Sequence, residues 1–110
     1  MANEGTNNGK MELSETAQRY DRLRMSIAFV RPPDTLVVTG GLAAAFPDDL
    51  PLILAKVKEF SMFTEGNDPW HEHDFGTFEH KGEKMFWKID DYRGNEGYNL
   101  VLTIMLASDY

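Results

Sequence analysis

Three strand-type runs, separated only by short turns, most strongly constrain the fold of this chain. They cover residues 75–81, 84–91 and 98–107 and are rich in aromatic and branched side chains. Gly82 lies in the first turn, where it supplies the positive φ that a tight hairpin needs, and two glycines lie in the second. Consecutive strands joined in this way are typical of antiparallel pairing, so the sequence predicts a three-stranded antiparallel meander.

Alternation along these runs predicts which side chains are buried. Within 84–91, one face carries Met85, Trp87 and Ile89, and the other carries Phe86, Lys88 and Asp90. The run 98–107 is apolar on both faces, which indicates a central strand.

The first half of the chain predicts helix, strand, helix. Ser14 is a candidate N-cap for a helix over 14–29, which the Pro32-Pro33 pair ends. A strand over 35–39 ends in a Gly40-Gly41 turn, and residues 42–46 add a helical turn. A second long helix is expected over 49–61, with an aspartate cap and a proline in its first turn. The predicted class is therefore α+β, with the helices on one face of the sheet.

Composition narrows the classes of protein that remain. The 110 residues suit one domain, which we assign to 11–110 after a disordered lead over 1–10. Cysteine is absent, which excludes disulfides, thiolate catalysis and Cys-ligated metals. No apolar run approaches the ~20 residues of a membrane span, and the start has no leader pattern, so a cytoplasmic protein is expected.

The net charge of −7 is unevenly distributed. Residues 1–47 hold five acids and five bases, whereas residues 48–110 hold thirteen acids and six bases. Direct nucleic-acid binding by the second part is disfavoured, because phosphate contacts depend on Lys and Arg. A basic protein partner is the better expectation.

The segment 67–80, NDPWHEHDFGTFEH, contains all three histidines and four acids. On an extended backbone His71 and His73 would point the same way, and with Asp74 they would form a candidate metal site. Without metal, His73, Asp74 and Asp90 are candidates for acid–base catalysis. The alternative is that His73 and Asp74 only fasten the loop to the sheet.

The same region also suggests a protein-binding surface. Trp70 stands among carboxylates, and an exposed tryptophan is a frequent anchor at interfaces. The acids also have a plainer explanation, namely solubility. The candidate partner-binding residues are Asp68, Trp70, Glu72, Asp74, Asp90, Asp91 and Glu96.

Four segments resemble a known family. They are FTEGNDP at 63–69, EHDFGTFE at 72–79, FWKIDDY at 86–92 and LTIMLA at 102–107. In this order they are similar to the domain of unknown function 3768, over about residues 35–110. The resemblance implies a small bacterial protein often encoded on plasmids and other mobile elements, and it implies no reaction.

Together these features predict a non-enzymatic protein without a cofactor. Its carboxylates would replace phosphates in the Arg- and Lys-rich groove of a host nuclease or CRISPR effector, giving an anti-CRISPR or anti-restriction inhibitor. The alternative is a small hydrolase or nuclease, with or without metal. Gly40-Gly41 is expected to be a turn and not a phosphate site.

Overall fold

The computed structural model describes residues 13–93 and 99–110. The lead predicted over 1–10 and the candidate Glu96 lie outside the described residues. The elements, in chain order, are α1 (Glu15–Met25), the 3-10 turn η1 (Ile27–Phe29), β2 (Thr35–Val38), α2 (Gly40–Ala45), α3 (Leu50–Lys58), β3 (Phe75–His80), β4 (Glu83–Asp91), β5 (Leu100–Leu106) and the 3-10 turn η2 (Ala107–Asp109).

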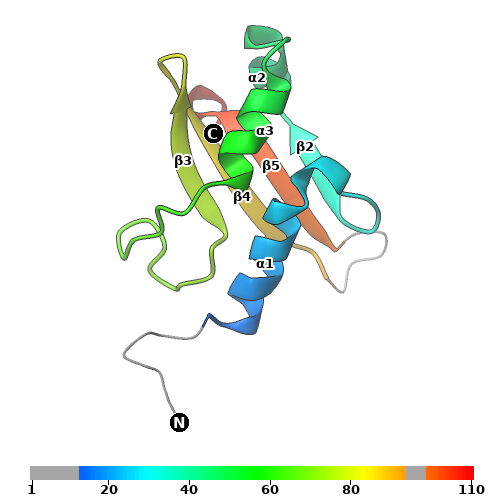
Figure 1. Ribbon diagram of the computed structural model, residues 1–110, viewed down its shortest axis with the longest axis vertical. Helices are drawn as coiled ribbons and strands as arrows, with labels where there is room; N and C mark the ends of the chain where they lie inside the picture. Colours follow the sequence, from blue (N-terminus) through cyan, green and yellow to red (C-terminus); the bar gives the residue numbers. More distant parts are fainter. Residues whose placement is uncertain (1–12, 94–98) are drawn as a thin grey trace.

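The strands form a four-stranded sheet in the order β2-β5-β4-β3 (Figure 1). The antiparallel pairs β3–β4 and β4–β5 confirm the predicted meander. The prediction of a three-stranded sheet was wrong, because β2 joins it parallel to β5, with Thr35 beside Val101 and Val38 beside Ile104. The sequence did not reveal this pairing, because parallel strands are joined by a long crossover and by no local turn; the pairing gives β5 a hydrogen-bonded neighbour at each edge, as expected for a central strand.

The helices cover one face of the sheet, as predicted, with α3 above α1 and the C-terminal ends of the two helices meeting (Figure 1). Ser14 caps α1 by accepting a hydrogen bond from the Ala17 N–H at 3.0 Å. The helix ends at Met25 and continues only as η1, so it is shorter than predicted. Gly40 and Gly41 open the short helix α2, so the turn predicted there was wrong. Among the helices of the described ranges, none is long and apolar enough to cross a membrane.

The predicted alternation along β4 is confirmed. Met85, Trp87 and Ile89 are buried beneath the helices. Gly76 lies opposite Trp87 in the β3–β4 register. A Cβ at this glycine would lie 2.7 Å from Cε2 of Trp87 and 2.8 Å from Cζ of Phe60. The indole therefore fills the space over β3 that a larger residue would need.

A second contact fastens the start of α3 to the β3–β4 hairpin. Asp49 occupies the N-cap position, but its carboxylate lies 2.9 Å from both Nε2 of the buried His80 and Nζ of Lys81. These hydrogen bonds, first from Lys81 and then from His80, lower the pKa of Asp49. Gly82 has a φ of 82°, which confirms the predicted role of this glycine in the hairpin turn.

Candidate functional site: the loop between α3 and β3

Residues 61–74, which we call the Trp70 loop, connect α3 to β3 and project beyond the β3 edge (Figure 1). The loop is held from within by Asp68, which is only 3% exposed. The carboxylate of Asp68 accepts hydrogen bonds from the backbone N–H groups of Glu72 at 3.0 Å and His73 at 3.2 Å. Thr64 and Asn67 bond reciprocally at the other end of the loop. The segment has no helix or strand but a dense set of local bonds.

His73 connects this loop to α1. Its Nδ1 lies 3.0 Å from Oδ1 of Asp21, and its Nε2 lies 3.7 Å from Oδ2 of Asp68. The imidazole stacks on the ring of Phe63, with centroids 3.8 Å apart and planes 3° apart. With a carboxylate at each nitrogen and a ring on one face, His73 acts as a tie between the loop and α1.

Arg24 completes this interior network. The side chain is almost fully buried and donates to the carbonyl oxygens of Val57, Lys58 and Phe60 at 2.8–3.0 Å. It also pairs with Asp21 at 3.1 Å. A helix leaves its last carbonyls without internal partners, so the guanidinium satisfies the C-terminal end of α3 from α1. We call the set Asp21, Arg24, Asp68 and His73 the anchoring network.

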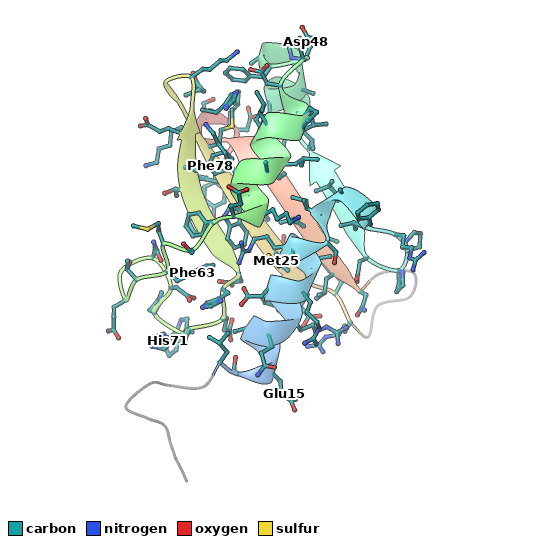
Figure 2. All side chains as sticks on the ribbon, viewed as in Figure 1. Glu15, Met25, Asp48, Phe63, His71 and Phe78 are labelled. Carbon is teal, nitrogen blue, oxygen red and sulfur yellow. The ribbon has the colours of Figure 1, made fainter. Side chains whose placement is uncertain are left out.

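The outer side of the Trp70 loop has the opposite character. Trp70 is 81% exposed and Met62 is 70% exposed. The Glu65 side chain is 92% exposed, and its carboxylate lies 3.8 Å from Nε2 of His71 at the loop's outer rim (Figure 2). An aromatic ring, a thioether and a carboxylate thus face solvent on a loop fixed from inside.

Carboxylates gather where the loop enters β3. Burial, and then the charges of Asp68 and Asp90, raise the pKa of Asp74 above its usual value. The Tyr20 hydroxyl lies 3.5 Å from Oδ2 of Asp91. Burial, and then the charges of Asp91 and Glu72, raise the pKa of Tyr20. Asp91 is itself paired, since the hydrogen bond from Arg93 lowers its pKa. The carboxyl that burial and neighbouring acids disfavour as an anion is therefore that of Asp74.

The structure corrects part of the predicted partner surface. Asp68 faces inward, because its oxygens bond the backbone of its own loop. Asp90 pairs with Lys88 at 2.8 Å, and Asp91 pairs with Arg93 at 2.9 Å. Trp70 is exposed, and Glu72 and Asp74 are partly so. The available surface is thus smaller than the predicted set, which ran from Asp68 to Glu96.

The candidate metal site is not assembled. His71 and His73 have φ values of 56° and 58°, so the backbone between them is not extended and the expected alternation fails. His71 faces Glu65, whereas His73 faces Asp21. Across residues 13–93 and 99–110, no three His, Asp or Glu side chains are placed to hold a metal ion.

The candidate catalytic set is also separated. Asp90 lies with Lys88 on the sheet face opposite Trp87, whereas His73 stacks on Phe63, which packs against Trp87. His73 and Asp90 are therefore on different sides of β4. Asp21 and Arg24 were not among the site residues predicted from the sequence. Arg24 follows Tyr20 by four positions on the buried stripe of α1, and this spacing was the available signal.

The chain was compared with protein families, curated proteins and solved structures. Residues 38–100 match the family model described as "Protein of unknown function (DUF3768)". The chain belongs to this family. The match runs from the last residue of β2 to the first residue of β5 and includes the whole Trp70 loop. The resemblance seen in the sequence is thereby confirmed. No curated protein and no solved structure matches the chain.

Proposed function

We propose that this DUF3768 protein is a non-enzymatic binding protein that engages a basic surface of a partner protein through the Trp70 loop. The observation that carries the proposal is an 81% exposed tryptophan on a loop that a buried network holds in place. Tryptophan is among the residues that contribute most to interface energy. A loop that is already ordered loses little conformational entropy when it binds.

The charge around Trp70 supports a basic partner. Glu65 is exposed on the same loop as the tryptophan, and Asp74 keeps a carboxyl whose pKa is raised by burial and by other acids. A cation from a partner would relieve that repulsion, so part of the binding energy is available only in the complex. Arginine guanidinium groups suit this role, since they pair with carboxylates through two parallel hydrogen bonds.

Within the class of basic partners, we propose a nucleic-acid-binding host defence protein. The Arg- and Lys-rich groove of a nuclease or CRISPR effector offers the required charge, and occupying it would inhibit the defence system. The mobile-element setting implied by the family resemblance favours this class. The proposal places the protein in the cytoplasm, where such partners act. The hydrolase alternative is less favoured, because Nδ1 of the partly buried His73 is engaged with Asp21 and Nε2 lies 3.7 Å from the buried Asp68.

The test is a pull-down from host lysate with the full chain, at low and at high salt, followed by mass spectrometry. We expect a nucleic-acid-binding protein at low salt, with capture lost at high salt and lost in Trp70→Ala. Tyr110→Ala is the matched control, because Tyr110 is also an aromatic residue, 78% exposed, but follows η2 and belongs to neither the loop nor a binding site proposed here. Capture that Trp70→Ala leaves unchanged, or no captured protein at either salt, would contradict the proposal.

A phage-restriction assay tests the inhibitory step. Cells that carry an active restriction or CRISPR system are infected with and without expression of the protein. We expect plaque counts to rise with the wild-type protein and with Tyr110→Ala, and to stay low with Trp70→Ala. A rise in plaque counts that persists in Trp70→Ala would show that inhibition does not depend on the Trp70 loop, and would contradict the proposal.

A further inference from the structure

The arginines of the described chain fall into two groups. Arg24 and Arg93 form ion pairs, with Asp21 and Asp91 respectively. Arg19, Arg22 and Arg31 form no ion pair with any residue in 13–93 or 99–110. All three line one hollow of about 610 Å³, which we call the arginine groove. In a protein of net charge −7, the unpaired arginines are therefore concentrated at one place.

The groove lies between α1, the segment that follows it and the start of β5. Arg19 and Arg22 are three positions apart on α1 and so share a face of the helix. Arg31 reaches the groove from the turn before β2. This turn lies on the β2 side of α1, whereas the Trp70 loop lies on the β3 side (Figure 1). The hollow adjoins a second one of about 380 Å³, which Arg19 and Arg22 also line.

The nearby carboxylates form no ion pair with these arginines in the described chain, although Asp91 is close enough for the charge of Arg19 to help lower its pKa. Asp34 lines the groove, but its Oδ1 accepts a hydrogen bond from the Leu100 N–H at 3.1 Å. Asp91 is held by Arg93. Glu15, at the start of α1, lines only the second hollow. The Nε of Arg19 is buried and has no hydrogen-bond partner. A buried donor without a partner is unfavourable, so the Arg19 guanidinium is incompletely satisfied within the described chain.

The lining also includes an aromatic ring. Phe29 is 81% exposed and lies at the rim of the groove beside the arginines. Guanidinium groups bind phosphate oxygens through two parallel hydrogen bonds, and an exposed ring offers a face on which a nucleobase stacks. The volume is within the range of small-ligand sites and is too small for a duplex.

We infer that the arginine groove binds a nucleotide, with its phosphate on Arg19, Arg22 and Arg31 and its base on Phe29. The phosphate and base could belong to a free mononucleotide or to the end of a single strand, since the recognised chemistry is the same. The site is separate from the Trp70 loop and does not depend on the function proposed for that loop.

The test is a titration of the full-length protein, followed by amide NMR shifts and calorimetry. The probes are adenosine 5′-monophosphate, ribose 5-phosphate, adenosine and a 5′-phosphorylated four-nucleotide strand. We expect the mononucleotide to bind more tightly than ribose 5-phosphate, and adenosine to give no saturable shift. Saturable binding by the strand, with the same arginine dependence, would identify a strand end as the source of the nucleotide.

Two variants test the phosphate contact and the base contact separately, and a third variant serves as a control. Arg22→Gln should weaken binding of both phosphorylated probes by about tenfold, the size expected for one charge-assisted hydrogen bond. Phe29→Ala should weaken the nucleotide severalfold and leave ribose 5-phosphate unchanged. Lys84→Gln removes the same charge from the exposed face of the hairpin and should change neither. Equal weakening by Lys84→Gln, or no shift at Arg19, Arg22 and Phe29 at millimolar nucleotide, would overturn the inference.

Discussion

The Trp70 loop and the arginine groove each expose an aromatic ring to the same extent, yet they treat charge in opposite ways. In the loop, charges are matched inward: Asp68 bonds backbone amides, and Asp21 faces both His73 and Arg24. In the groove, Arg19, Arg22 and Arg31 are left without ion pairs in the described chain. The charged groups of the loop therefore stabilise the fold, whereas the arginines of the groove are available to bind a ligand.

Replacing a buried and an exposed arginine of α1 tests this separation most strongly. Arg24→Met should lower the free energy of unfolding by about 3–5 kcal/mol, because it leaves Asp21 and the last carbonyls of α3 without their buried partner. Arg22→Met, two positions earlier and exposed, should change it by less than about 0.5 kcal/mol. Urea denaturation of both variants makes the measurement. Similar losses would show that the groove arginines also support the fold.

Replacing the two histidines of the loop should give a smaller difference in the free energy of unfolding. His73→Ala removes the contacts to Asp21, Asp68 and Phe63 and should cost about 1–3 kcal/mol, with faster amide exchange across residues 61–74. His71→Ala removes only an exposed contact to Glu65 and should have little effect on either quantity. Equal exchange rates in the two variants would mean that His73 does not hold the loop.

Replacing Asp74 should change the free energy of unfolding only slightly, and it should raise that free energy where the other replacements lower it. Its folded pKa is raised, so the stability it contributes is present below the unfolded pKa and is lost as pH rises through the folded value. Asp74→Asn should therefore stabilise the protein at pH 7, by less than about 1 kcal/mol because the carboxyl is partly solvated. The gain should vanish below about pH 3.5, under the ordinary pKa of aspartate.

Thermal unfolding from pH 3 to pH 8 measures this effect. Asp48→Asn, at an exposed carboxylate between α2 and α3, controls for the change in net charge (Figure 2). A gain of equal size at every pH, or the same gain in Asp48→Asn, would exclude a local cause at Asp74.

Local rules predicted much of this fold. The alternation of the apolar residues located the buried face of β4, and Ser14 and Gly82 marked a helix start and a hairpin. The parallel pairing of β2 with β5 was missed because it joins residues that are 66 positions apart. No turn residue encodes such a pairing, which depends on the packing of the whole sheet.

The candidate site was predicted less well, for a related reason. Trp70 was recognised because an apolar residue in a polar loop stands out, and it is exposed. The inward position of Asp68 follows from hydrogen bonds to backbone amides, which composition does not reveal. The two histidines diverge because both adopt positive φ, which a pattern of alternating residues does not anticipate. The arginine groove arises from three elements and has no sequence motif.

The position of β5 bears on how the protein is made. This strand lies between β2 and β4, although it is the last of the four in the sequence. While the ribosome is still synthesising residues 39–99, β2 has no neighbour to pair with, and β4 lacks one of its two partners. The sheet therefore closes only after residues 100–106 leave the exit tunnel, and until then the apolar faces of α1 and α3 have no complete surface to cover.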